Sequence, residues 1–261
     1  MKKLAKFKKT KIKILFTDID DTLTDHGELR AEAYEALWNL KEKGIKVVPV
    51  TGRPAGWCEM IARFWPVAGV VGENGAFYFR YSKKKMIRHF ALAESERLKF
   101  RNRLDGEIKY RILKDVPGCA ISSDQFCRLT DLAVDFCEDV PPLKERDVEK
   151  IVQIFESFGA KAKISSIHVN GWFGDYDKLT MCKVFAKTEL KIDLTKPRIL
   201  KEVAFVGDSP NDEPMFAYFP NSFAVANIGR FLKKLKSPPQ FLAPSKGGRG
   251  FSEIVNKILL T

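Results

Sequence analysis

The chain has 261 residues, enough for one large or two modest domains. Hydrophobic residues make up 45% and charged residues 30%, which excludes a largely disordered chain. The net charge is +12, but seven lysines lie in the first 13 residues, and without them the charge is 12 − 7 = +5. The basic balance is thus mainly a property of the N-terminal segment, which we expect to be a solvated arm. It gives little support to a nucleic-acid-binding fold.

Membrane and disulfide-rich classes are also disfavoured. No apolar run reaches the roughly 18 residues of a membrane span, and the apolar stretch 14–16 is too short for a signal-peptide core. The five cysteines are odd in number and form no CxxC pair, which argues against a disulfide framework or a zinc ribbon. We expect a reduced, cytoplasmic protein that does not associate with membranes. The sequence does not indicate an oligomeric state.

The first part of the chain alternates between strands and helices. Residues 12–17 are an apolar run that predicts a buried strand, and residues 29–43 have the apolar spacing of a helix. A second strand is predicted over 45–50, a helix over 54–64, and a third strand over 67–71. This alternation is typical of a parallel sheet with right-handed crossover connections.

A mixed block follows before the alternation resumes. Its predicted elements are a strand over 76–81, a helix over 94–104, one or two strands within 119–137, a helix over 143–158 and a strand over 161–169. The later elements are a helix from Lys178, strands over 202–206 and 222–226, a glycine-rich loop over 247–250 and a helix over 251–260. We therefore predict an α/β fold: a Rossmann-like, doubly wound parallel-sheet core (1–75 and 172–261) with an inserted α+β cap domain (76–171).

Polar residues follow three of the predicted parallel strands. Asp18 and Asp20 follow the first strand, Thr51 follows the second, and Asp208 with Asp212 follows the strand over 202–206. The carboxyl ends of such strands form the ligand crevice of open α/β sheets, so we expect these groups to converge. Clustered aspartates repel one another unless a cation is bound, and hard oxygen ligands favour Mg²⁺.

Four motifs, in this order, resemble those of the haloacid dehalogenase superfamily of phosphotransferases. They are FTDIDDTLT at 16–24, VTGR at 50–53, Lys178 within DYDKLT, and GDSPND at 207–212. The TGR form and the position of the insertion resemble the type IIB cap group, which includes sugar-phosphate phosphatases.

The resemblance implies two-step phosphoryl transfer. Asp18 would attack phosphorus and form an aspartyl-phosphate, while Asp20 would protonate the leaving alkoxide and then activate water. Mg²⁺ would be held by Asp18, Asp208 and the main-chain carbonyl of Asp20. The phosphate would be bound by four residues: Thr51, Gly52, Lys178 and Asn211.

Other residues have a supporting role or remain open. Asp212, with Asn211, would orient Lys178 and metal-bound water, although Lys183 or Lys187 could take the place of Lys178. Arg53 could contact substrate or pair with an acid, and Asn74 could act at a hinge, contact substrate or simply form a turn. Three residues near the return to the core are either structural or contact the substrate from the cap: His168, Asn170 and Trp172.

The residues and the resemblance together predict a Mg²⁺-dependent phosphomonoester hydrolase. Its substrate is expected to be a small phosphorylated metabolite, in particular a sugar phosphate. A phosphomutase would share every core residue and remains an alternative. The second alternative is a basic nucleic-acid-binding protein on a vestigial fold, which the intact Asp18, Asp20, Lys178 and Asp208 disfavour.

Overall fold

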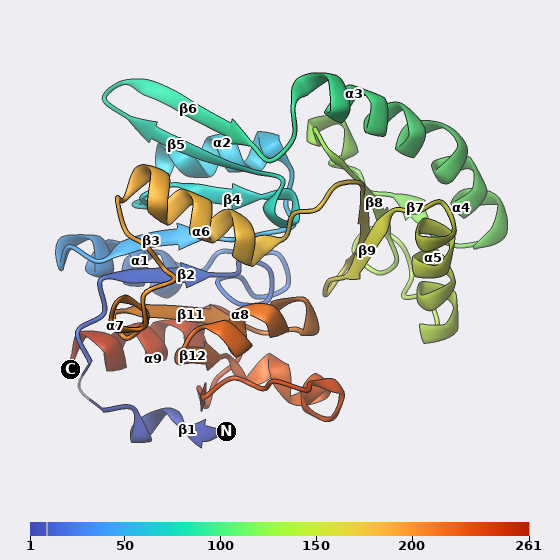
Figure 1. The fold of residues 1–261 in the computed structure, drawn as a ribbon. Helices are drawn as coiled ribbons and strands as arrows, with labels where there is room; N and C mark the ends of the chain where they lie inside the picture. The colour runs from blue at the N-terminus through green and yellow to red at the C-terminus, as the bar shows by residue number, and fades with distance from the viewer. Residues whose placement is uncertain (9, 261) are drawn as a thin grey trace.

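The computed structural model describes residues 1–8 and 10–260. Figure 1 shows a core in which a sheet lies between helices, and beside it a smaller body built from α3, α4, α5 and a second sheet. Two chain connections join these parts, one leading into α3 and one leading into α6. The predicted α/β class with a parallel-sheet core is confirmed.

The core sheet has six strands, and each neighbouring pair is parallel. In spatial order they are β1 (Lys2–Lys3), β13 (Phe241–Leu242), β12 (Asn221–Ala224), β11 (Val203–Gly207), β2 (Ile14–Thr17) and β3 (Lys46–Pro49). From β2 the chain first proceeds to β3 on one side and later returns to β11 on the other. The order of strands therefore reverses beside β2, and a ligand crevice forms at the carboxyl ends of β2 and β11.

Both faces of this sheet are covered by helices, which is why its strands are continuous apolar runs. Leu15 of β2 packs with α1, α2 and α9, whereas Ile14 and Phe16 pack on the opposite face with α6 and α8. The bounds of these helices are α1 (Ala31–Glu42), α2 (Ala55–Phe64), α6 (Lys178–Glu189), α7 (Pro197–Leu200), α8 (Glu213–Tyr218) and α9 (Gly247–Leu259).

A three-stranded antiparallel sheet extends the core beyond β3. It consists of β4 (Val70–Gly72), β5 (Phe77–Ser82) and β6 (Lys85–Phe90), and a parallel bridge between Val50 and Val71 joins it to the core. Asn74 and Gly75 form the turn between β4 and β5 with φ of 56° and 104°, as this dipeptide predicts. Residues 77–90, expected within the inserted domain, instead pack on the core. We therefore propose that the inserted domain spans residues 91–171.

The inserted domain has its own sheet and its own apolar core. Its elements are α3 (Glu94–Arg103), a π-helical turn (Leu104–Ile108), α4 (Lys109–Asp115), β7 (Ala120–Ile121), β8 (Asp131–Asp135), α5 (Glu145–Ser157), β9 (Lys161–Ile164) and β10 (His168–Trp172). The strands pair antiparallel in the order β7–β8–β10–β9, and Leu132, Ile151 and Phe155 are fully buried between sheet and helices.

The prediction of a single strand over 161–169 is wrong. The chain turns at residues 165–167, where the Ser165 main chain donates a hydrogen bond to the carbonyl of His168 (2.8 Å) and its hydroxyl accepts one from the His168 N–H (3.0 Å). Serine side chains form such local turns, which compete with a continuous strand. The turn places residues 165–168 at the edge of the crevice.

Both ends of the chain also differ from the prediction. The N-terminal segment is no solvated arm among its described residues, because Lys2 and Lys3 pair with β13 and Phe7 is buried against Phe223 and Phe241. The last helix begins at Gly247, so the glycine-rich segment is its first turn and not a loop. A Cβ on Gly248 would lie 2.8 Å from the Leu23 carbonyl oxygen, so this close approach requires glycine. Within the described residues, no helix combines the length and apolar character needed to cross a bilayer.

Candidate active site

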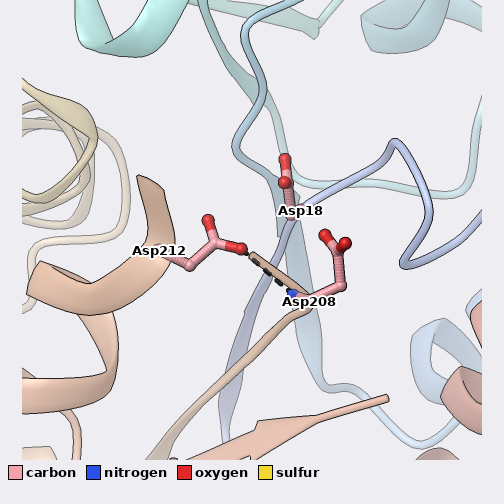
Figure 2. Close-up of side chains that lie close together, drawn as sticks. All are labelled: Asp18, Asp208 and Asp212. Carbon is pink, nitrogen blue, oxygen red and sulfur yellow. Dashed lines mark hydrogen bonds between the residues drawn. The ribbon is translucent and has the colours of Figure 1, made fainter. Parts of the chain in front are cut away.

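Three buried aspartates meet at the carboxyl ends of β2 and β11. One oxygen each of Asp18, Asp208 and Asp212 lies within 4.8 Å of the others, and Figure 2 shows the three side chains converging. The Asp18 N–H donates to the Val206 carbonyl (2.9 Å), so the pairing of β2 with β11 sets its position. The Asp208 N–H donates to Asp212 Oδ2 (3.1 Å), the dashed line of Figure 2. Parallel strands thus bring together two motifs that are 190 residues apart in the sequence.

Lys178 joins this cluster from the first position of α6. Its Nζ lies 3.1 Å from Asp18 Oδ1 and 3.0 Å from Asp212 Oδ1. Although burial disfavours its charge, Asp18 and Asp212 raise the pKa of Lys178 above the ordinary value, so it stays protonated. Of the two alternative lysines, Lys183 lies over the Tyr218 ring (3.9 Å) and Lys187 is exposed to solvent. The geometry therefore favours Lys178.

The cluster fits a divalent cation. The three carboxylates and Lys178 have a formal charge of −3 + 1 = −2, and Asp208 Oδ2 is buried without a hydrogen-bond partner. Burial raises the pKa of Asp18 to about 8 despite the neighbouring ammonium group, and burial also raises the pKa of Asp208. Carboxylate oxygens are the ligands that Mg²⁺ prefers, and a bound cation would stabilise their ionised forms.

Asp20 contributes its side chain to another part of the site. Its carboxylate accepts a hydrogen bond from Arg53 Nε (2.9 Å). Among the described residues, it is not one of the three aspartates whose oxygens lie close enough together to hold a cation. Ligation of a metal by its main-chain carbonyl stays a prediction. Arg53 is buried, and its guanidinium lies 4.4 Å from the centre of the Trp57 ring.

The residues expected to bind phosphate lie around the same crevice. Thr51 is buried, and its hydroxyl accepts a hydrogen bond from the Arg53 N–H (3.0 Å), which leaves its own proton free to donate. Gly52 lies so close to Asn74 that a Cβ would be 3.3 Å from the amide nitrogen, which is buried without a partner. Asn211 accepts a hydrogen bond from the Ser209 hydroxyl (2.7 Å). Their contact with phosphate stays a prediction.

A pocket opens above this floor, between the core and the inserted domain. Its core side is lined by Asp18, Asp20, Gly52, Arg53, Ser209 and Asn211. Its roof is lined by Arg128, Ser165, Ser166, Ile167, His168 and Asn170. Trp172, the third residue suggested from the sequence, lines a neighbouring pocket with Asn74 and Lys178 instead.

Several residues of the roof were not expected from the sequence. Ser165 and Ser166 lie shortly before His168, so a turn-forming Ser-Ser pair was the available signal. Arg128 is fully buried, bonded to Asp124 and Asp131, and its Nη1 donates to the Gly52 carbonyl (2.8 Å). The i,i+3 and i,i+4 spacing of these acids around an arginine predicts an ion pair but not a contact with the other domain.

Glu73 fixes the inserted domain to the core beside Arg128. Its buried carboxylate accepts hydrogen bonds from the N–H groups of Ala55 (3.0 Å), Leu129 (2.9 Å) and Thr130 (2.7 Å), and from the Thr130 hydroxyl. Burial, reinforced by Asp131, raises the pKa of Glu73 to about 7. One side chain of the core thereby satisfies two adjacent N–H groups of the inserted domain and fixes the loop that carries Arg128.

Replacing Glu73 with alanine is expected to lower the free energy of unfolding by about 3 kcal/mol or more, because each buried donor left unpaired costs roughly 1–3 kcal/mol. Urea denaturation followed by circular dichroism measures this loss. Glu59→Ala is the matched control, because Glu59 makes only exposed ion pairs with Arg63 and Arg88, and a change below about 1 kcal/mol is expected. Equal losses in the two variants would contradict the anchoring role of Glu73.

Comparison with known proteins finds a family match for part of the chain and relatives along most of it. Residues 15–124 match the family described as haloacid dehalogenase-like hydrolase. The phosphoglycolate phosphatase of Pyrobaculum aerophilum is 29% identical over 251 residues, covering 95% of this chain and 96% of the relative. Phosphoglycolate phosphatase 1 of Saccharolobus solfataricus is 23% identical over 264 residues, covering 95% and 96%.

Solved structures share the whole fold, including the inserted domain. The Thermoplasma acidophilum protein 0175 superposes with a TM-score of 0.72 at 19% identity, over 96% of this chain and 99% of that one. The sucrose-phosphatase of Synechocystis, solved with sucrose and phosphate, gives a TM-score of 0.63 at 14% identity, over 95% and 98%. Part of the chain thus matches the haloacid dehalogenase-like hydrolases, and the fold of the chain is that of the superposed structures. The two relatives, which match this chain over 95% of its length, are both named as phosphatases.

Proposed function

We propose that this protein is a phosphatase of the haloacid dehalogenase type, a Mg²⁺-dependent phosphomonoesterase that acts on a small phosphorylated metabolite through an aspartyl-phosphate intermediate. The observation that carries the proposal is the cluster at the base of the pocket. There the Lys178 ammonium group lies between Asp18 and Asp212, beside a buried Asp208 oxygen without a partner. This arrangement provides a nucleophile, a cation site and a positive charge for the phosphoryl group in one place.

The residues divide the chemistry between them. Asp18 attacks the phosphorus atom and forms the acyl phosphate, and Asp20 gives a proton to the leaving alkoxide and later takes one from the attacking water. Lys178, the Thr51 hydroxyl and the main chain near Gly52 bind the phosphoryl oxygens, while Asp212 holds Lys178 in place. Mg²⁺ held by Asp18, Asp208 and the Asp20 carbonyl would neutralise the repulsion between carboxylate and phosphate.

The roof of the pocket supports a small substrate. The inserted domain covers the crevice with Arg128, the 165–168 turn and Asn170, so a phosphate on a folded protein or a nucleic-acid end does not fit beneath it in this closed arrangement. Polar groups on the roof are suited to hydroxyl or carboxylate groups of a leaving alcohol. A sugar phosphate and phosphoglycolate are both candidates.

A substrate screen tests the proposal. We expect Mg²⁺-dependent release of inorganic phosphate from sugar phosphates, phosphoglycolate or p-nitrophenyl phosphate, and loss of turnover with EDTA that Mg²⁺ restores. Ca²⁺ is expected to restore little activity, because its longer bonds and higher ligand number allow Asp18 to bind it through both oxygens and lose its attack geometry.

The same screen separates the alternatives. Conversion of a sugar phosphate into its isomer without phosphate release would identify a phosphomutase. Faster hydrolysis of a phosphoprotein or a DNA end than of every metabolite would contradict the covered pocket. Full activity in Ca²⁺, or in EDTA, would contradict the proposed cation site.

A further inference from the structure

A series of polar contacts connects the proposed acid–base residue with the inserted domain. Asp20 accepts from Arg53 Nε (2.9 Å), and Arg53 Nη2 donates to Glu138 Oε1 (2.8 Å). The second carboxylate oxygen of Glu138 lies 2.9 Å from His168 Nε2. Asp20 and Arg53 belong to the core, whereas Glu138 and His168 belong to the inserted domain, so this series of contacts exists only while the domain covers the pocket.

Hydrogen bonds within its own loop fix the main chain at Glu138. Residues 137–139 follow β8, and the Asp135 carboxylate accepts hydrogen bonds from the N–H groups of Cys137 (2.9 Å), Glu138 (2.8 Å) and Asp139 (2.8 Å). Although partial burial opposes it, the bonds with His168 and Arg53 lower the pKa of Glu138 to about 2, so it is an anion. Its side chain keeps 26% of its surface exposed, whereas that of Arg53 keeps 5%.

Glu138 does not line the pocket, but both of its partners do. It can therefore influence the reaction only through Arg53 and His168. Arg53 holds the Asp20 carboxylate, and its own position is set by the Trp57 ring and by Glu138. Without Glu138 the guanidinium keeps Asp20 and a longer contact with Asp124 (3.5 Å) as partners, and its orientation is less defined.

We propose that Glu138 is a positioning residue that fixes Arg53, and through it Asp20, when the inserted domain closes over the pocket. Closure would thereby place the proton donor of the proposed phosphatase reaction at the leaving group. This inference rests on the proposed function and deepens it, because it assigns to the inserted domain a part in proton transfer as well as in covering the substrate.

The leaving group provides the test. An alkoxide needs a proton as it departs, whereas p-nitrophenolate leaves without one, so a misplaced donor slows phosphoryl transfer to Asp18 only for the alkyl phosphate. The hydrolysis of the aspartyl-phosphate is common to both substrates, so kcat/KM, which reports the transfer step, is the quantity compared. We expect Glu138→Gln to lower kcat/KM on an alkyl phosphate, either phosphoglycolate or the best sugar phosphate of the screen, by about 10-fold, and kcat/KM on p-nitrophenyl phosphate by less than about 2-fold. Glu138→Asp keeps the charge but has a shorter side chain, so its kcat/KM on the alkyl phosphate should lie between that of the wild type and that of Glu138→Gln.

A double-mutant cycle separates positioning from a general structural effect. On an Asp20→Asn background, Glu138→Gln should cost nothing further, because the donor that it positions is gone. Glu145→Gln is the matched control: Glu145 also pairs with the core, through Lys234, but it touches no site residue, and its activity on both substrates should be unchanged. Thermal unfolding shows whether each variant is folded.

Three outcomes would contradict the inference. Equal losses on both substrates, an additive loss on the Asp20→Asn background, or no loss at all would overturn it. Failure of the proposed function is distinguishable, because it would appear as absence of metal-dependent hydrolysis of every phosphomonoester by the wild-type protein.

Discussion

Replacing Asp18 with asparagine is expected to lower kcat by at least about 10³-fold while the protein remains folded. The amide is nearly the same size as the carboxylate, but it is a poor nucleophile and withdraws one negative charge from the proposed cation site. The pairing of β2 with β11 sets the position of Asp18 through its main-chain N–H, which the substitution leaves intact. Release of phosphate from p-nitrophenyl phosphate under saturating Mg²⁺ measures the loss.

Asp21→Asn is the matched control for this variant. Asp21 lies in the same acidic loop, but its carboxylate points to Arg230 (3.3 Å), and asparagine tolerates its positive φ of 54°. We expect its activity to stay within about 3-fold of wild type, because it touches no residue of the proposed mechanism. If the Asp18 variant kept a tenth of wild-type activity, Asp18 would not be the nucleophile.

The core of this site could be predicted from the sequence because its residues follow strands whose direction is fixed. Parallel strands bury both faces and read as apolar runs, so β2, β3 and β11 are visible as such, and their carboxyl ends must share one edge. The convergence of Asp18, Asp208 and Asp212 follows from that rule alone. Lys178 was predicted from its motif and not from periodicity, so the sequence did not exclude Lys183 and Lys187 as alternatives.

The roof could not be predicted in the same way. Arg128 and Glu138 are found in irregular segments, and their contacts with Gly52 and Arg53 depend on how the inserted domain docks. No short-range pattern encodes a hydrogen bond between residues 76 or 85 positions apart. The hairpin of β5 and β6 was predicted to belong to the inserted domain, because the sequence shows where strands occur but not against which of the two domains they pack.

A second large effect is expected at Lys178. Replacing it with methionine removes the charge but keeps most of the side-chain volume, and it leaves Asp18 and Asp212 facing each other without the ammonium group that lies between them. The phosphoryl oxygens lose a cationic partner in the transition state, so we expect kcat to fall by about 10²- to 10³-fold. The measurement is steady-state hydrolysis of p-nitrophenyl phosphate with Mg²⁺.

Lys183→Met is the matched control, because Lys183 lies on the same helix, five residues further along, and contacts the Tyr218 ring instead of the carboxylates. Its activity should remain within about 2-fold of wild type, since an exposed or half-exposed cation–π contact contributes about 0.5–1 kcal/mol to stability and nothing to the site. The Lys178 variant should lose more activity than the Lys183 variant, because Lys178 is the lysine that contacts Asp18. Were the Lys183 variant the more impaired of the two, the phosphate-binding role would belong to a different turn of α6, and the contact of Lys178 with Asp18 and Asp212 would serve only to balance buried charge.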